Sequence, residues 1–424
     1  MRLIIYENRF VFEKEDGDET FYEGIQSKEA QKRAAYIKTQ LENDYLTNLI
    51  KEQMISTNEV LILPENSKKA LEELVNSVTS EVGRAIIGLT FMQLAIKAIA
   101  PKQSIRLHKG GKSKRDFSWT EGVSMRTLDK AFVTPILRQF GLLSLNADGF
   151  MMTRSLAENY PYSAFYKAAV RGAKLQWLTI VEHLESNELE AEIGLKYFVR
   201  LLANRTAKFN HLANEAVLKV DVFVKEKTKS ELIDFVFEYV SYDDYSARLF
   251  EIAIHSAFQV LDEKHLLDGE LKPLSQMRSA NKKHKNIGDI EVEYKAGSRM
   301  ITEAWDTKFD KTNLREEIEE LYEKLVDQPE CKVAGFISNQ EPLINDAISN
   351  RIEEIEDALG DVSIKLLSFK SFIQDEIAPR FEGKDDWEKW VKFFVECIAQ
   401  KRRYHAPIDE PCQEWLDRIN RKMS

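Results

Sequence analysis

Two segments in the C-terminal half of the sequence combine acidic residues with a lysine in a pattern typical of β-strands. The first segment is Gly288–Tyr294 (GDIEVEY) and the second is Met300–Phe309 (MITEAWDTKF). Successive side chains of a strand point to opposite faces, so Asp306 and Lys308 lie side by side on one face of the second strand. An acid next to an amine could take part in proton transfer or in the stabilisation of a negatively charged transition state.

Asp289 in the first segment extends this arrangement. If the two strands are neighbours, the Asp289 carboxylate reaches the same face as Asp306 and Lys308. Two converging carboxylates repel each other unless a cation neutralises them, and their hard oxygen atoms favour Mg²⁺ or Mn²⁺. Such an ion can activate water for attack on a phosphodiester, while Lys308 offers a positive donor. Glu291, two residues further along the strand, is an alternative first acid.

These residues resemble the signature of the PD-(D/E)xK nucleases, with Asp289 as the first acid and Asp306-Thr307-Lys308 as the (D/E)xK tripeptide. The similarity covers Ser246–Phe372 and implies an αβββαβ nuclease core. It implies Asp289, Asp306 and Lys308 as catalytic residues, and Asp289, Asp306 and Thr307 at a Mg²⁺ site that Mn²⁺ can also fill. Gly288 replaces the proline of the signature, which leaves the acid intact. The simpler interpretation is a surface strand pair with alternating charges.

The helix expected at Ser246–Leu261 carries Glu251, His255 and Gln259 four residues apart, so the three side chains share a helix face. In nucleases of this superfamily, the helix before the first core strand often presents a glutamate to the metal, and Glu251 matches that position. The resemblance therefore implies Glu251 as a fourth catalytic residue. An exposed polar stripe on a half-buried helix is the alternative, and we expect His255 to be structural.

The elements around these residues alternate between helices and strands. After the two strands we expect, in order, a charged helix, a strand, a second helix and a last strand, at Leu314–Val326, Cys331–Ser338, Ala347–Leu359 and Val362–Phe369. This alternation is typical of an α/β domain. We assign residues 236–424 to it, so that the fold class of the whole chain is α/β, or α+β overall.

A basic segment stands out against a chain whose net charge is −10. Residues 101–130 contain eight Lys or Arg residues and three acids. The run at 109–115 (KGGKSKR) has no apolar residue and is predicted to be an exposed, mobile loop. If it is more than a solvated loop, it provides cations that bind DNA phosphates.

The residues that follow predict a winged-helix-like arrangement. A helix at 124–141 begins after Ser124, ends at Gly141 and should bend at Pro135. Two short apolar runs flank the turn residues at 146–149 and are predicted to form a hairpin. We expect Lys112, Lys114 and Arg115 to bind phosphates, and Arg126, Lys130 and Arg154 to contact phosphates or guanine edges.

Three regions follow from these patterns. Residues 1–100 form a mostly helical region that opens with a strand pair, residues 101–235 a basic, winged-helix-like region, and residues 236–424 the nuclease domain. The apolar stretch at 85–100 is interrupted by Gln93 and Lys97 and is too short and polar to span a bilayer, so no membrane association is expected. The three cysteines lack metal or disulfide spacing, which favours a reducing cytoplasm.

With both halves considered, the chain resembles type II restriction endonucleases, and Phe117–Arg205 is similar to the SacI-like family within them. The resemblance implies a Mg²⁺-dependent homodimer that cuts a short palindrome in double-stranded DNA. It also implies a cognate DNA methyltransferase that protects host DNA. Two alternatives are a non-catalytic DNA-binding regulator and a structure-selective DNA repair nuclease.

Overall fold

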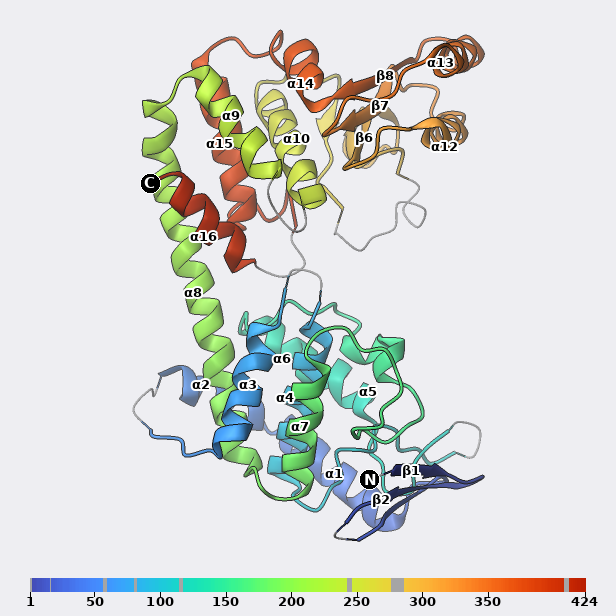
Figure 1. Ribbon diagram of the computed structural model, residues 1–424, viewed down its shortest axis with the longest axis vertical. Helices are drawn as coiled ribbons and strands as arrows, with labels where there is room; N and C mark the ends of the chain where they lie inside the picture. Colours follow the sequence, from blue (N-terminus) through green and yellow to red (C-terminus); the bar gives the residue numbers. More distant parts are fainter. Residues whose placement is uncertain are drawn as a thin grey trace. The chain divides into compact units, whose positions relative to one another are not determined.

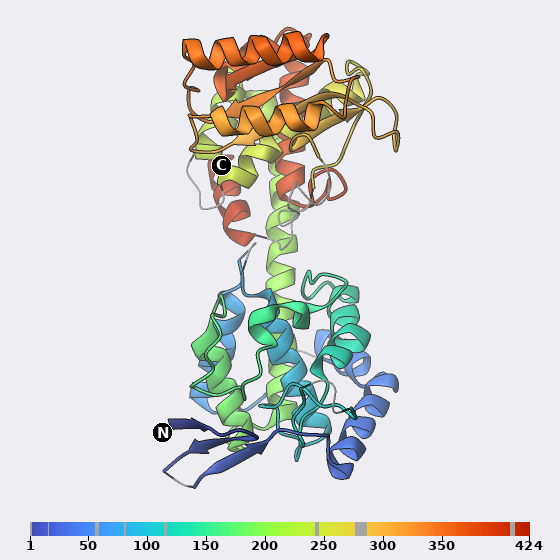
Figure 2. The same cartoon turned by 90° about the vertical axis from the view of Figure 1, so that its right-hand side faces the viewer.

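The computed structural model describes residues 2–15, 17–55, 59–79, 82–113, 117–241, 246–275, 286–407 and 412–424. The chain divides into two compact units, one that extends to Lys208 and one that begins at Phe209 (Figures 1 and 2). Helix α8 (Ala191–Glu226) contributes residues to the hydrophobic cores of both units. In the part of the chain that is described, no helix has the length and apolar character needed to cross a membrane.

The N-terminal unit opens with a small antiparallel sheet. Its strands, in the order β1-β2-β3, are Arg2–Ile5, Arg9–Glu13 and Glu19–Tyr22. The alternation of the sequence places Phe10, Phe12 and Phe21 on one face, where they pack against Trp119. The predicted strand pair is therefore confirmed, with a third strand added.

The rest of the N-terminal unit is mainly helical. Its longer helices are α1 (Lys28–Glu42), α2 (Tyr45–Ile55), α3 (Glu65–Asn76), α4 (Arg84–Ile99) and α7 (Lys174–Glu185). Helix α4 is buried on nearly all sides, as the apolar stretch predicts, and lies at the centre of one core. That core takes residues from both sides of position 100. The first two predicted regions, 1–100 and 101–235, thus share a core instead of each having its own.

The segment that begins at Ser124 has the predicted bend. It consists of α5 (Met125–Leu128), the π-helical turn η1 (Asp129–Val133) and α6 (Thr134–Gln139). Pro135 lies in the first turn of α6, where its missing N–H is tolerated, and the widened π turn precedes it. Gly141 follows the last turn with a φ of 64°, a left-handed conformation that glycine adopts without strain.

The predicted hairpin is wrong, and with it the winged helix. Residues 142–153 contain no strand; Phe150–Met152 (η2) and Arg154–Leu156 (η3) are short 3₁₀ turns instead. The buried carboxylate of Asp129 accepts a hydrogen bond from the Met151 N–H at 2.8 Å, which withdraws that donor from any strand ladder. The Phe150 ring packs directly against Gly88 of α4. Tertiary packing on α4 therefore overrides the local turn pattern.

We expect Gly88→Ala to destabilise the protein, although alanine normally favours a helix over glycine by about 1 kcal/mol. A Cβ at position 88 would lie 2.5 Å from the Phe150 ring, so the overpacked core should lose roughly 1–3 kcal/mol of unfolding free energy. Denaturant unfolding measures the loss. Adding Phe150→Leu should recover part of it, and a stabilised Gly88→Ala protein would contradict the contact.

The C-terminal unit is built on a mixed five-stranded sheet. Its strands, in the order β4-β5-β6-β7-β8, are Glu270–Leu271, Ile290–Glu293, Ile301–Lys308, Val333–Ser338 and Ser363–Ser368. The pairs β4–β5 and β5–β6 are antiparallel, whereas the pairs β6–β7 and β7–β8 are parallel. The predicted α/β class is confirmed at this level, and every predicted strand of this region lies within two residues of its observed position.

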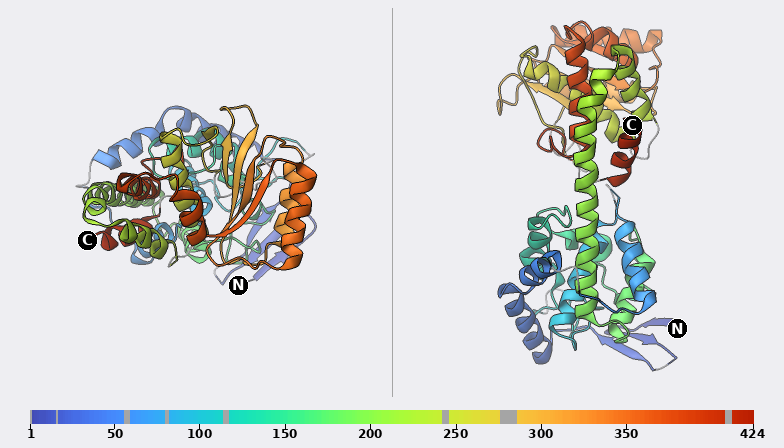
Figure 3. Two further views of the ribbon diagram at one scale, coloured as in Figure 1. Left: turned by 90° about the horizontal axis from the view of Figure 1, so that it is seen from above. Right: turned by 90° about the vertical axis from the view of Figure 1, so that its left-hand side faces the viewer.

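Helices cover both faces of this sheet (Figure 3). Helices α12 (Arg315–Leu325) and α13 (Asp346–Leu359) share one core with Ala304 of β6, and α10 (Ser246–Glu263) shares another with Trp305 of the same strand. The remaining elements pack on the α10 side, and they are α9 (Lys229–Ser241), α14 (Phe369–Ser371), η4 (Phe372–Ile377), α15 (Lys384–Ile398) and α16 (Gln413–Lys422). Adjacent residues of β6 thus belong to different cores, as strand alternation requires.

Candidate active site

The antiparallel pairing of β5 with β6 brings Asp289 to the end of β6. Ile290 pairs with Trp305, so Asp289, one residue before β5, lies opposite the Asp306–Thr307 peptide. The Asp289 carboxylate accepts hydrogen bonds from the backbone N–H of Thr307 at 3.0 Å and from its hydroxyl at 2.8 Å. A Cβ at Gly288 would lie 2.5 Å from the Trp305 carbonyl. Glycine thus allows the close approach that a proline would obstruct.

Asp306 and Lys308 lie on the same face of β6, as the alternation predicts. The Lys308 ammonium contacts the Asp306 carboxylate at 2.8 Å, and their side chains are 22% and 12% exposed. The ring of Phe336 on β7 lies beneath the ammonium, at 5.7 Å from its centroid. The amine is therefore fixed at the end of the strand but remains accessible from solvent.

The two aspartates form a coupled pair. Their carboxyl groups are hydrogen-bonded to each other. Burial and the negative charge of Asp289 raise the pKa of Asp306 to about 7. Burial would also raise the pKa of Asp289, but hydrogen bonds from Asp306 and Thr307 outweigh it and hold that pKa below its ordinary value. Asp306 is therefore partly protonated near neutral pH, whereas Asp289 is ionised.

Glu251 on α10 belongs to the same electrostatic cluster. Burial raises the pKa of Glu251 to about 7, and the charge of Asp289 adds to this effect, whereas Arg248 and Lys308 oppose it. Arg248 forms an ion pair with Glu251 at 2.5 Å. The structure therefore brings Asp289, Asp306, Lys308 and Glu251 to one end of the sheet. We did not single out Arg248 from the sequence, although its spacing from Glu251 permits a helical ion pair.

His255 and Gln259 lie further along α10 and are almost completely buried, so the exposed-stripe alternative is wrong for them. The Arg402 guanidinium donates to the side-chain oxygen of Gln259 at 2.6 Å, which turns the Gln259 amide nitrogen toward Nδ1 of His255 at 2.9 Å. Nδ1 must then accept, and Nε2 donates to the Lys272 carbonyl at 2.9 Å. His255 is therefore a neutral structural residue, and burial lowers its pKa to about 3.

Glu291 has a different environment from Asp289. Its carboxylate is buried, binds the Lys272 ammonium and accepts a hydrogen bond from the Ile287 N–H. Its oxygens are therefore engaged away from Asp306. The geometry favours Asp289 over Glu291 as the first acid.

Substitution of Asp289 should affect activity more than stability, and substitution of Glu291 should affect stability more than activity. We expect Asp289→Asn to remove activity of the site with little loss of stability, because the amide can keep one oxygen as an acceptor for Thr307. Glu291→Gln should lower the melting temperature while the remaining folded protein stays active, because it weakens a buried ion pair with Lys272. An assay of whatever activity the site supports, carried out beside thermal denaturation, measures both. An inactive but fully stable Glu291→Gln protein would reverse the assignment.

The Asp289/Asp306 pair fits the requirements of a magnesium site. Asp289 and Asp306 would hold a divalent cation, since Mg²⁺ commonly uses one or two carboxylates while it keeps several waters. Thr307 lies between the two acids and orients Asp289. Within the described residues, no group of three His, Cys, Asp or Glu side chains is arranged to hold a metal ion. A site built from two carboxylates would leave positions open for water and phosphate oxygens.

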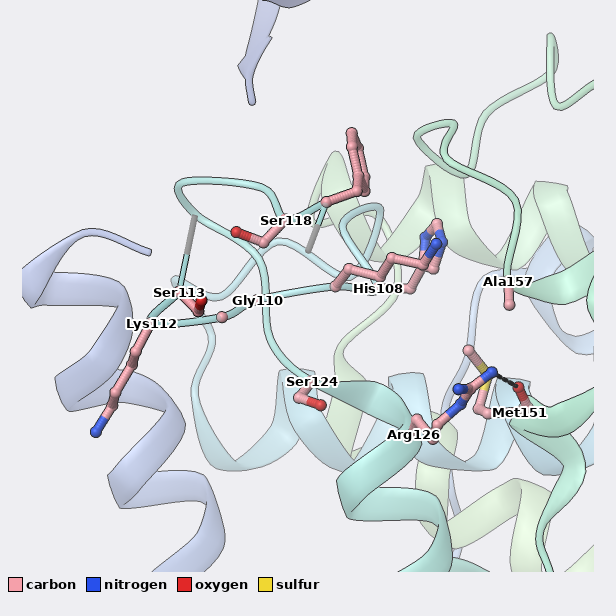
Figure 4. Close-up of a pocket in the computed structure, with 12 residues that line it drawn as sticks. His108, Gly110, Lys112, Ser113, Ser118, Ser124, Arg126, Met151 and Ala157 are labelled. Carbon is pink, nitrogen blue, oxygen red and sulfur yellow. Dashed lines mark hydrogen bonds between the residues drawn. The ribbon is translucent and has the colours of Figure 1, made fainter. Parts of the chain in front are cut away.

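The cationic residues that were predicted to bind DNA lie in different surroundings in the N-terminal unit. Lys112 and Arg126 line a cavity together with Lys109 (Figure 4). Lys130 is exposed on η1, and Arg154 is 97% exposed beside Glu158. Lys114 and Arg115 lie outside the described residues. Four of the six predicted DNA-binding residues can thus be placed, all of them at the surface or at the cavity.

Two features of the basic segment differ from the sequence-based expectation. Arg106, counted among its cations, is fully buried and pairs with Glu182 at 2.6 Å. The Gly110–Gly111 part of the expected mobile loop is packed: a Cβ at Gly110 would lie 2.3 Å from the Gly122 carbonyl, and the Gly111 carbonyl accepts a hydrogen bond at 3.0 Å. The accessible positive charge is therefore smaller and more localised than the composition suggests.

Comparison with known proteins gives no assignment. No protein-family model matches the sequence, and no curated protein matches it.

Proposed function

We propose that the protein is a metal-dependent endonuclease that hydrolyses phosphodiester bonds in double-stranded DNA. The observation that carries this proposal is the convergence of Asp289 and Asp306, whose carboxyl groups are hydrogen-bonded to each other, beside the Lys308 ammonium. A strand pair with only a structural role has no need of two buried carboxyls that repel each other when both are ionised.

Each residue of the cluster has a role in this chemistry. Asp289 and Asp306 would hold Mg²⁺ or Mn²⁺, which when bound supplies Lewis acidity and lowers the pKa of its water. The Thr307 N–H and hydroxyl orient Asp289. The Lys308 ammonium stabilises negative charge that develops on the phosphate oxygens.

Glu251 provides a proton acceptor beside these groups. With a pKa of about 7, its carboxyl group is partly ionised at neutral pH and can take a proton from the attacking water. Arg248 limits the rise of that pKa and fixes the side chain through their ion pair.

The order of elements supports the nuclease interpretation. Helix α10 is followed by β4, β5 and β6, then by α12 and β7, which is the αβββαβ order of the PD-(D/E)xK core. Within that superfamily we propose a type II restriction endonuclease that recognises a short palindrome. A cognate DNA methyltransferase would then protect the host DNA.

The basic residues would contribute to DNA binding without a wing. We propose phosphate contacts by Lys112 together with Lys114 and Arg115, and phosphate or base contacts by Arg126, Lys130 and Arg154. The four that are placed by the structure all belong to the N-terminal unit, whereas the acidic cluster belongs to the C-terminal unit. DNA binding by these residues and phosphodiester hydrolysis would therefore belong to different units of the chain.

Incubation of the purified protein with plasmid DNA and Mg²⁺ tests the proposed function. Discrete bands on a gel, absent in EDTA and absent with Asp306→Asn, are the expected result. A smear would indicate a nonspecific nuclease, and cleavage confined to branched or damaged DNA a repair nuclease. Intact DNA with every substrate, despite DNA binding, would overturn the nuclease proposal and favour a regulator.

We further expect a homodimer on DNA, because each chain has one Asp289/Asp306/Lys308 site and a double-strand break needs two such sites. A two-fold symmetric protein also matches a palindrome. In Ca²⁺, a poorer activator of water, the protein should bind a duplex that carries its site without cutting it. Light scattering of that complex should give two chains per duplex. One chain per duplex, with nicked plasmid as the sole product, would contradict the dimer.

A further inference from the structure

The basic segment surrounds a cavity of about 640 Å³ in the N-terminal unit (Figure 4). The residues that matter most for its chemistry are His108, Lys109, Phe117 and Arg126. Gly110 and Gly111 form part of the wall, where the backbone packs closely against Gly122 and the Gln26 side chain. Figure 4 shows the Lys112 side chain directed away from His108 and Arg126, so the cations that line this part of the cavity are the half-buried Lys109 and the exposed Arg126.

Arg126 lies close enough to Lys109 to disfavour the positive charge of the lysine. Burial lowers the pKa of Lys109 and the charge of Arg126 lowers it further, while the negative charge of Glu158 opposes both effects. Lys109 donates to the Asn159 side chain, and Arg126 donates to the Met151 carbonyl at 3.4 Å. Among the described residues, no carboxylate lies within 4 Å of either cation. Two such cations in a partly buried cavity are stabilised by an anion between them.

His108 adds a polar group of a different kind. It is 2% exposed, stacks on Tyr162 with ring centroids 4.6 Å apart, and lines the cavity. Neither ring nitrogen has a partner of good hydrogen-bond geometry, but the backbone of Ala157 and Glu158 lies near enough to form long, poorly aligned hydrogen bonds that partly oppose the fall of its pKa. Burial and the charge of Lys109 lower the pKa of His108 to about 3. The ring is therefore neutral and offers one donor and one acceptor.

We propose that this cavity binds one nucleotide, with its phosphate between Lys109 and Arg126 and its base directed toward His108. The Phe117 ring, over which the Lys109 ammonium lies at 5.4 Å, provides an aromatic surface for the base. The volume falls within the range of about 300–1,000 Å³ typical of ligand sites. Inorganic phosphate alone would contact the two cations, whereas a nucleotide could also offer well-aligned hydrogen bonds to His108.

The ligand of the cavity can be a free nucleotide, or one nucleotide of a DNA strand that is turned out of its stack. The proposal stands on the cavity alone and does not depend on the nuclease activity. Binding is therefore measured in EDTA, with the full-length protein, so that plasmid cleavage and cavity occupancy succeed or fail independently.

Calorimetry with each deoxynucleoside monophosphate, with inorganic phosphate and with a short single-stranded oligonucleotide tests the proposal. We expect at least one nucleotide or the oligonucleotide to bind more tightly than phosphate. Arg126→Gln should weaken that binding about tenfold, the value of one charge-assisted hydrogen bond. Lys102→Gln is the matched control, because Lys102 is an exposed cation of the same segment that does not line the cavity.

His108→Asn tests whether the cavity binds a nucleotide or only a simple anion. It should weaken nucleotide binding and leave phosphate binding unchanged, with thermal denaturation used to confirm that the protein is folded. Tighter binding of the monophosphate than of the oligonucleotide identifies a free nucleotide, and the reverse order identifies a strand. The proposal is overturned if nothing binds, if phosphate binds as tightly as every nucleotide, or if Arg126→Gln and Lys102→Gln behave alike.

Discussion

Asp306→Asn should reduce Mg²⁺-dependent DNA cleavage by at least about 10³-fold while specific DNA binding in Ca²⁺ remains measurable. The amide keeps the shape of the side chain and can still donate to Asp289, so the fold of β6 is preserved. It removes the negative charge that the proposed metal ion would need and that the Lys308 ammonium contacts. Single-turnover cleavage of a plasmid or a short duplex measures the change.

Asp268→Asn provides the matched control. It makes the same chemical change in an acid that is 65% exposed and pairs, among the described residues, with the surface lysine Lys332, so cleavage should stay near the wild-type rate. If Asp306→Asn cleaves as fast as this control, Asp306 has no part in the chemistry and the site assignment fails.

The same substitution should change how stability depends on pH. Asp306 has a pKa of about 7 in the folded protein and about 3.8 unfolded, so the folded state holds its proton more tightly. This contribution to stability is complete below about pH 4 and is lost as the pH rises through 7. At roughly 1.4 kcal/mol per pKa unit, the wild type should lose about 2–4 kcal/mol across this range in EDTA. Asp306→Asn has no such proton to lose.

Melting temperatures measured in EDTA at pH 5 and pH 8 for both proteins test this expectation. Asp306→Asn should be the more stable of the two at pH 8. Addition of Mg²⁺ at pH 8 should raise the melting temperature of the wild type and leave that of the variant nearly unchanged, since a ligand stabilises only the state that binds it. Equal pH profiles for the two proteins would show that Asp306 does not retain a proton.

The C-terminal site was accessible from the sequence because its determinants are local. Alternation in Met300–Phe309 fixes which side chains share a face, and the observed sheet places Asp306 beside Lys308 accordingly. The position of Asp289 required only that the next strand be a neighbour. The distinction between Asp289 and Glu291 was not accessible, because it depends on Lys272, which lies on another segment.

The N-terminal unit was harder to predict because long-range packing decides its structure. The residues around 146–149 have the composition of a hairpin turn, and Gly149 does adopt a positive φ. Residues of the second predicted strand make other contacts instead. Met151 is hydrogen-bonded to Asp129, 22 positions earlier, and Phe150 packs on Gly88, 62 positions earlier. The burial of Arg106 likewise follows from Glu182, a residue 76 positions away.

The strand that carries Asp306 and Lys308, β6, lies where the backbone amides of the sheet should be best protected from hydrogen exchange. It is the middle strand of five, hydrogen-bonded to β5 on one edge and to β7 on the other. Amide protons of such a strand exchange with deuterium only when the sheet opens, so those of residues 303–307 should be among the slowest in this unit. Asp306 and Lys308 are thus attached to the part of the chain that opens last. Fraying of the sheet edges would leave their spacing intact.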